Sequence, residues 1–446
     1  MVRSAVADDR LLLYFNNVAK QNTYSVGLIL GQSLSGKDYV IHFAKTPPVH
    51  SQDAKDGPSP GHRIKSINDI DEDWVADHAR QATRMLPGGM HVLGVFFVGP
   101  DDVLNFVSPK IRGILSRVHK HLAAQKYLFG NPPNNEELVL YYCVTTQQFS
   151  CKSVELATGS VRPAEFKFLT SPMKWAQINC KYQMDQVYHI NENESDWPLK
   201  KHMGIILDMM NKNLKSSVYL FDGELKDGDE SVESIGKKKI PRSNKTSGQE
   251  DHLKPLQVCI LQPCQGDDQN SFQISESGNQ IRIFGHVVSK LWLNPKISIN
   301  VASEAVMQDI MRSLTTRLEM HWDSLTEEEH GEDMNSVHEP PRRVLISLPN
   351  TNIAISDYLF PGEGPHDAKI SLEEMLDIKI HNDADVVDAE GQADLSEYYN
   401  ESMESESEEV IAKKPTEDNR TLHFIGLGVA LLVLITSLVI HFIQEI

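Results

Sequence analysis

The feature that most constrains the fold is an apolar run near the end of the chain. From Phe424 to Ile440 the sequence contains no charged side chain, and apolar neighbours extend the span to 22 residues. An α-helix rises about 1.5 Å per residue, so the span measures roughly 33 Å, close to the thickness of a bilayer core. It lacks the polar stripe of a surface helix. We therefore predict a single transmembrane helix at 421–443, with these membrane-anchoring residues: Leu422, Phe424, Leu431, Leu434, Ile440 and Ile443.

The charges beside this span predict its orientation. Lys413, Lys414 and Arg420 precede it, whereas Gln444, Glu445 and Ile446 follow it. Positively charged flanks stay on the cytosolic side of a membrane, so we expect residues 1–420 to be cytosolic. A span this near the C-terminus leaves the ribosome only as synthesis ends, so we expect insertion after translation.

The acidic charge is concentrated in one segment. The formal net charge is −19, and residues 381–410 hold eleven acidic side chains and no Lys or Arg. We interpret this segment as a self-repelling, extended spacer. Nucleic-acid binding needs a basic surface, so we expect no nucleic-acid partner.

The cysteines favour a reducing compartment. Their number is odd, and no pair has the spacing of a zinc site. Buried structural thiols are the simpler interpretation, although Cys143, Cys151 or Cys180 could serve as a nucleophile with one of the histidines. The five are Cys143, Cys151, Cys180, Cys259 and Cys264.

Hydrophobic periodicity predicts a mixed α/β (α+β) protein. Short apolar runs predict strands at 24–30, 39–43, 91–98, 137–144, 150–157, 177–190, 256–262, 280–284, 297–301 and 343–348. Helical spacing predicts helices at 8–19, 72–85, 101–124 with a break at Ser108-Pro109, 199–214, 303–323 and 371–378, the last with Glu374 at a capping-box position. Composition predicts a first domain at 1–220, a polar linker or loop at 221–254, a smaller α/β domain at 255–380 and an acidic linker at 381–420.

One glycine-containing segment matches the first part of the phosphate-binding loop motif. Gly31 to Lys37 matches G-x-x-x-x-G-K and follows a predicted strand. A phosphate-binding loop continues with Ser or Thr and then a helix, but here Asp38 and a second strand follow. We therefore interpret the segment as a hairpin turn.

Two glycine-anchored strands resemble the MPN domain, the fold of metalloproteases that remove ubiquitin-like modifiers. The matching segments are Val26–Gly31 and Met90–Pro100. In that family a Glu precedes the first strand, and G-W-x-H-S-H-P followed by Ser and Asp ends the second. The two His and the Asp hold zinc, and the Glu is the general base. The alternative is that Gly94–Pro100 is simply a core strand and its turn.

The resemblance implies a domain without its catalytic chemistry. Tyr24 stands at the Glu position, Phe97 and Gly99 at the two His positions, Val107 at the Ser position and Lys110 at the Asp position. None of these side chains offers a good zinc ligand, and Lys110 adds positive charge. We expect an inactive MPN-like domain over 1–220, with no catalytic residue, metal or cofactor.

Nearly the whole chain resembles the odorant response abnormal protein 4 family. The resemblance is carried by Tyr24–Gln32, Lys37–Ile41, Thr46-Pro47-Pro48, the spacing to Trp74 and the apolar C-terminal span. It implies a tail-anchored, single-pass protein of the endoplasmic reticulum membrane that supports surface delivery of some G-protein-coupled receptors. It also implies a partner, the cysteine protease specific for the ubiquitin-fold modifier, paired through MPN-like domains.

These observations lead to three hypotheses of different classes. The first is a non-catalytic, membrane-tethered adaptor that localises the modifier-specific protease. The second is a direct receptor escort or chaperone that contacts cargo through Phe424–Ile440. The third, an active metalloprotease, requires ligands that the sequence lacks.

Overall fold

The computed structural model describes residues 3–19, 24–48, 64–100, 108–124, 126–130, 136–236, 254–262, 277–327, 338–349, 351–380 and 382–391. Met1–Gly391 form one unit and Gln392–Ile446 a second. The predicted membrane helix and its anchoring residues therefore lie outside the described residues. Within the described part, no helix is both long and apolar enough to cross a membrane.

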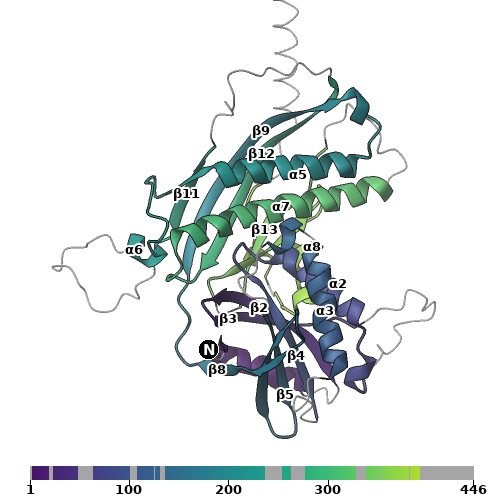
Figure 1. Cartoon of the computed structure of the whole chain (residues 1–446), viewed down its shortest axis with the longest axis vertical. Helices are drawn as coiled ribbons and strands as arrows, with labels where there is room; N and C mark the ends of the chain where they lie inside the picture. Colours follow the sequence, from purple (N-terminus) through teal and green to yellow (C-terminus); the bar gives the residue numbers. More distant parts are fainter. Residues whose placement is uncertain are drawn as a thin grey trace, which may run out of the picture. The chain divides into compact units, whose positions relative to one another are not determined.

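An eight-stranded sheet forms the first layer (Figure 1). Its strands are β1 (Ser4–Asp8), β2 (Ser25–Leu34), β3 (Lys37–Lys45), β4 (His91–Gly99), β5 (Glu136–Cys143), β6 (Gln148–Glu155), β7 (Val161–Pro163) and β8 (Glu165–Leu169). They lie in the order β7-β6-β5-β4-β2-β3-β1-β8. β7 and β8 are at opposite ends of this order, yet only Ala164 separates them, and its N–H donates to the Cys151 carbonyl (3.2 Å). The sheet therefore curls until its ends meet.

The two faces of this sheet bury different clusters. One face packs on helix α1 (Leu12–Ala19), where Phe15, Phe43 and Phe96 meet edge to face. The other packs on α2 (Glu72–Met85) and α3 (Pro109–Ala123). Asp71 caps α2 by accepting from the N–H groups of Asp73 and Trp74, and Ser108 caps α3. The short helix α4 (Lys126–Phe129) follows α3.

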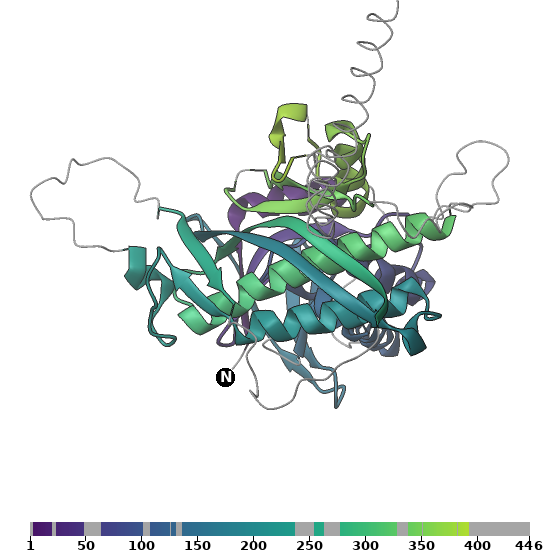
Figure 2. The ribbon, with the colours of Figure 1, turned by 90° about the horizontal axis from the view of Figure 1, so that it is seen from above.

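A four-stranded sheet with order β10-β11-β9-β12 forms the second layer. Its strands are β9 (Ala176–Asn191), β10 (Val218–Phe221), β11 (Leu256–Leu261) and β12 (Ser277–Leu293). Helices α5 (Leu199–Ser216) and α7 (Ile299–Glu327) run side by side along one face, as Figures 1 and 2 show. The inward side chains of β9 alternate with exposed ones, which is the pattern expected of a half-buried strand.

A third sheet, with order β14-β13-β15, packs against the face of the first sheet that also carries α2 and α3. Its strands are β13 (Arg342–Ser347), β14 (Ala354–Leu359) and β15 (Val386–Asp388). Helix α8 (Pro365–Leu376) follows β14, and α6 (Val232–Gly236) follows β10. Short 3₁₀ turns complete the described elements: η1 (Asp9–Leu11), η2 (Ile67–Asp69), η4 (Glu192–Glu194) and η6 (Asp383–Asp385).

The mixed α/β class is confirmed, but the chain does not divide at the expected linker. β9 from the expected first domain pairs along its whole length with β12 from the expected second domain. Phe221 ends β10 and is fully buried, and α6 follows at Val232–Gly236. The polar composition of 221–254 therefore does not mark a boundary, because its first part is held by the second sheet.

Two local predictions are wrong. The expected strand at 297–301 runs into the first turn of α7, where the Ser298 hydroxyl accepts from the Val301 N–H (3.5 Å). The expected helix at 371–378 begins earlier, at Pro365, because proline suits the first turn of a helix. Glu374 therefore lies inside α8 and does not occupy a capping position.

The expected acidic spacer begins later than position 381. Glu390 is buried, and its carboxylate accepts from Arg317 Nη2 (2.5 Å), from the Val288 N–H (2.9 Å) and from the Arg343 N–H (3.0 Å). This carboxylate links α7, β12 and β13. The acidic run up to Gly391 is thus part of the folded unit.

A buried ion pair joins the second and third sheets. Arg343 of β13 donates from Nη1 and Nη2 to the two carboxylate oxygens of Asp309 on α7, at 2.7 and 3.0 Å, and both side chains are fully buried. Asp309 also accepts from the Gly88 N–H (2.8 Å). The Arg343 guanidinium holds the pKa of Asp309 below its usual value despite burial.

We predict that Arg343→Met destabilises the protein strongly, because it leaves the Asp309 carboxylate buried without its countercharge. The expected loss is about 3–5 kcal/mol in the free energy of unfolding. Arg282→Met is the matched control, since Arg282 makes an equally well-formed pair with Asp185 (2.8 and 2.9 Å) at the surface. We expect it to cost less than about 1 kcal/mol. Urea unfolding of the full chain in detergent, followed by tryptophan fluorescence, measures both; equal losses would contradict the prediction.

Candidate functional site

The positions aligned with the metalloprotease site lie at the ends of β2 and β4. The two strands are antiparallel, with Ser25 opposite Val98 and Val26 opposite Phe97. Tyr24 immediately precedes β2, so this register places it beside Gly99, the last residue of β4. Two of the sequence-aligned positions are therefore brought together.

Aromatic side chains fill the space above Gly99. A Cβ atom built on Gly99 would lie 2.6 Å from Tyr24 Cε1 and 2.7 Å from Tyr141 Oη. Such distances are shorter than any normal contact, so no side chain larger than hydrogen fits there without movement of a ring. A histidine at this position would have to displace a tyrosine.

Of the other aligned positions, Phe97 lies on the same face of β4 as Gly99, because the two are two residues apart in the strand. Phe97 is buried in the cluster that faces α2 and α3. Lys110 lies in the first turn of α3, where its Nζ is 3.1 Å from Glu72 Oε1. Val107 lies outside the described residues. Across the described part of the chain, no group of three or more His, Cys, Asp or Glu side chains is arranged to hold a metal ion.

The described cysteines are placed as structural residues. Cys143 and Cys180 are buried, and Cys143 Sγ donates to the Pro100 carbonyl (3.3 Å). Burial raises the pKa of Cys151 and of Cys180 to about 12, which keeps both as protonated thiols at neutral pH. Cys259 is exposed on β11, and Cys264 lies outside the described residues.

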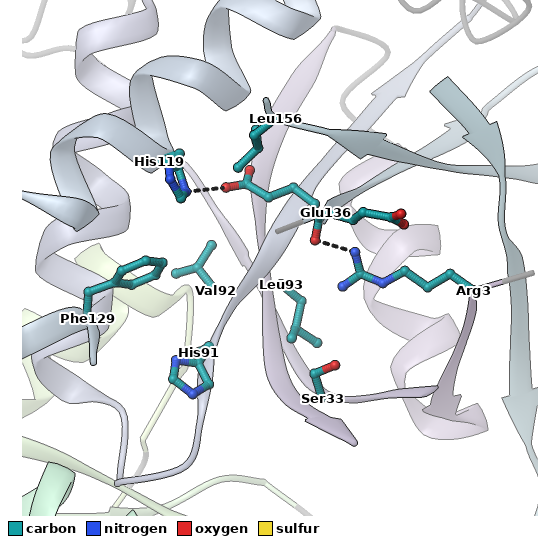
Figure 3. A pocket seen from close by; sticks show the side chains of 10 residues that line it. Arg3, Ser33, His91, Val92, Leu93, His119, Phe129, Glu136 and Leu156 are labelled. Atoms are coloured by element: carbon teal, nitrogen blue, oxygen red, sulfur yellow. Dashed lines mark hydrogen bonds and ion pairs between the residues drawn. The ribbon is translucent and has the colours of Figure 1, made fainter. Parts of the chain in front are cut away.

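A small cavity with both polar and apolar walls lies at the other end of the first sheet, with a volume of about 20 Å³. Figure 3 shows His119, Phe129 and His91 along one side and Arg3 with Glu136 on the other. The space suits about one water molecule, so it cannot admit an organic substrate.

Glu137 is a buried carboxyl group in the wall of this cavity. Its carboxylate is buried, Oε1 lies 3.7 Å from His119 Nδ1, and Oε2 has no hydrogen-bond partner within the described structure. Burial raises the pKa of Glu137 to about 8, and the nearby Arg3 opposes this only partly. Glu137 is thus mostly protonated at neutral pH. In the sequence, Glu137 is marked only as the second of two glutamates at the start of an apolar strand.

A second cluster of titratable side chains holds the C-terminus of α8. His42 Nε2 donates to the Leu376 carbonyl and His78 Nε2 to the Met375 carbonyl, both at 2.7 Å. Burial lowers the pKa of both histidines, so they bind these carbonyls as neutral rings. The last carbonyls of a helix have no partners within the helix, and these rings supply them. The Nδ1 atom of His78 also lies 3.1 Å from Thr46 Oγ1, so these contacts support a structural role for the ring.

We predict that Gly99→Ala destabilises the protein and that Tyr24→Ala reverses part of the loss. The added methyl group meets the Tyr24 and Tyr141 rings, and overpacking of this kind costs about 1–3 kcal/mol. In the double variant the Tyr24 ring is absent, so the two changes are coupled. The measurement is the unfolding midpoint of the two single variants and the double variant. Strictly additive effects would show that the Tyr24 ring does not fill this space.

Glu137→Gln is expected to change the pH dependence of stability. The pKa of Glu137 is raised from 4.5 to about 8 on folding, so folding takes up a proton between these values. Stability linked to this group therefore falls as pH rises from about 4.5 to 8. The Glu137→Gln variant has no group that titrates here. Its free energy of unfolding should therefore rise by about 2–4 kcal/mol relative to that of the parent as the pH is raised from 5 to 8.

The control for this prediction is Glu136→Gln, which makes the same chemical change one residue away. Glu136 is half-buried and pairs with Arg162 (3.0 Å) and Ser153 (2.5 Å). Urea unfolding at several pH values should separate the two variants. A constant difference between Glu137→Gln and the parent across this range would refute a raised pKa.

Comparison with known proteins places the chain in a family. The family described as "ODR4-like: Odorant response abnormal 4-like" matches residues 27–387. The "Protein odr-4 homolog" of Drosophila melanogaster is 26% identical over 481 residues, covering 97% of each chain. The "Protein odr-4 homolog" of Homo sapiens is 26% identical, covering 90% of this chain and 89% of that protein.

Among solved structures, the chain is similar to one described as "Crystal structure of UfSP from C.elegans". The TM-score is 0.46 with 8% identity, and the match covers 88% of this chain and 60% of that one. The chain thus spans about three fifths of the length of that protein. The sequence matches cover most of the residues on both sides, and the family match alone spans more than half of the chain. The chain belongs to the odorant response abnormal 4-like family.

Proposed function

We propose that this protein is a non-catalytic adaptor anchored by its C-terminus in the endoplasmic reticulum membrane. It binds and localises the cysteine protease specific for the ubiquitin-fold modifier, and it supports folding or trafficking of a subset of G-protein-coupled receptors. The proposal rests on the family membership and on the sequence resemblance to the MPN domain. Its bulk, residues 1–420, faces the cytosol.

The observation that carries the non-catalytic part is the filled space above Gly99. In the metalloproteases that the sequence resembles, this position belongs to a zinc ligand. Here a Cβ atom at Gly99 would lie within 2.7 Å of both the Tyr24 and Tyr141 side chains. Zinc hydrolysis needs three ligands and an open coordination position for water. Rings that fill this space leave no open position for a zinc-bound water, which supports a non-catalytic role.

The predicted membrane span supports an adaptor role, because it would attach the bound partner to the membrane. A partner bound to a tethered domain is confined near membrane substrates, which raises its effective concentration there. The acidic segment after Gly391 has seven acidic side chains up to residue 410 and no basic ones. Such a composition favours an extended spacer between the folded unit and the bilayer. The adaptor would thus hold its partner at a distance from the membrane surface.

We expect the modifier-specific protease to co-purify with the full-length chain from detergent extracts in a fixed stoichiometry. Deletion of 421–446 should release the protease from membranes while leaving the complex intact. The readouts are quantitative mass spectrometry of the purified complex and fractionation of the protease. A protease that stays on membranes in cells lacking this chain would contradict the proposal.

Replacement of 421–443 by an unrelated tail anchor separates the adaptor from the receptor escort. The adaptor needs only attachment, so receptor delivery should persist with the foreign span. The escort depends on the sequence of its own span, so delivery should fail. Zinc analysis and a modifier-cleavage assay on the same purified protein test for residual protease activity, and stoichiometric zinc with cleavage would overturn the non-catalytic part.

A further inference from the structure

A groove of about 1310 Å³ lies beside α1. Four segments that are distant in the sequence form its walls: residues 8–18, residues 172–175, residues 348–349 and 351–353 between β13 and β14, and residues 377–379 after α8. Pockets for small molecules have volumes of roughly 300–1,000 Å³. This groove is therefore large enough for a segment of a polypeptide chain.

The main chain beneath the groove is already engaged. Helix α1 covers the end of β3, where Phe43 is fully buried and the Lys45 N–H donates to Tyr14 Oη (2.9 Å). Tyr14 Oη in turn donates to Asp377 Oδ2 (3.0 Å). An occupant of the groove must therefore be recognised by the side chains of its walls.

The charged side chains of these walls have an excess of positive charge. Among the described residues that line the groove, four are basic and two are acidic: Arg10, Lys45, Lys174 and Lys379 against Asp8 and Asp377. Both carboxylates are engaged by neighbouring side chains, Asp8 by Arg10 (2.7 Å) and Asp377 by Tyr14. In a chain of net charge −19, the groove is thus a local region of positive charge.

Two of the basic side chains are exposed on different walls. Lys174 lies in the 172–175 wall, and Lys379 follows α8. Lys379 Nζ is 3.6 Å from Glu373 Oε1, but both side chains are more than half exposed, so this ion pair is weak. A carboxylate of a bound partner can therefore approach either lysine at little cost.

Apolar side chains also reach the groove. Leu13 is 65% exposed on α1, and Met173 and Pro349 line two of the other walls. Exposed apolar side chains beside positive charges favour a ligand that offers both apolar and acidic groups. A polypeptide segment can offer both along its length.

We propose that this groove binds a segment of a partner protein that carries acidic side chains among apolar ones. Its carboxylates pair with Lys174 and Lys379, and its apolar side chains pack on Leu13 and Met173. The inference goes beyond the adaptor proposal and does not depend on it, because its test needs neither the modifier-specific protease nor the membrane span.

The test begins with selection of a phage-displayed library of random peptides on the full-length chain in detergent micelles. Enriched sequences should carry Asp or Glu among apolar residues. Fluorescence anisotropy with a labelled, enriched peptide then measures affinity. The affinity should fall as the salt concentration is raised, since salt screens exposed ion pairs.

Reversal of the two exposed charges tests the acidic part of the proposal. Lys174→Glu combined with Lys379→Glu should weaken binding about tenfold or more, because two attractions become repulsions. A peptide with Lys in place of its acidic residues should bind this double variant more tightly than it binds the parent. Lys212→Glu is the matched control, since Lys212 is exposed on α5 outside the groove, and it should leave affinity unchanged.

Truncation of an exposed leucine tests the apolar part. Leu13→Ala should weaken binding about three- to tenfold, because it removes apolar surface that the peptide buries. Leu225→Ala is its control, since Leu225 is 72% exposed outside the groove. The substituted side chains are all exposed, so every variant should keep the parent's unfolding midpoint.

Four outcomes would overturn the proposal: enrichment of no sequence, enrichment of sequences without acidic residues, equal losses in the control variants, or failure of the charge-swapped peptide to prefer the double variant. Soluble dihexanoyl phosphatidylserine provides a further test. Its binding to the parent but not to the Lys174→Glu/Lys379→Glu variant, with no peptide enriched, would assign the groove to lipid and overturn the proposal.

Discussion

The fold depends on two buried arginines that connect segments distant in the sequence. Arg312 of α7 donates to the main-chain carbonyls of Leu86, Pro87, Met90 and Leu128 at 2.8–3.3 Å, so α7 is fixed to the loop before β4 and to α4. Arg343 fixes α7 to β13 through Asp309. A buried guanidinium has a large desolvation cost, and only a full set of acceptors offsets it. These contacts form only when the three sheets are assembled, which explains why the polar segment at 221–254 does not separate domains.

Local sequence patterns are sufficient to predict the helices and strands that are long or strongly periodic. α2 occupies Glu72–Met85 as expected, and β9 alternates as its sequence indicates. The short strands β1 and β8 are not predicted, because their pairing partners are distant in the sequence: β1 pairs with β3 and with β8. The structural role of Glu390 also depends on residues distant in the sequence and is not visible in the local pattern. A carboxylate in an acidic run is normally solvated, and only the convergence of Arg317, Arg343 and Val288 makes it structural.

Part of the candidate site can likewise be predicted from the sequence, and part of it cannot. The alignment of glycines in two strands placed Tyr24 and Gly99 at equivalent ends, and the strand register brings them into contact. Phe97 is a buried core side chain and Lys110 pairs with Glu72, so neither supplies the zinc ligand that the family motif places at its position. Glu137 could not be predicted. Its raised pKa arises from burial, which the nearby Arg3 opposes only partly, and neither the burial nor the position of Arg3 is a property of its own strand.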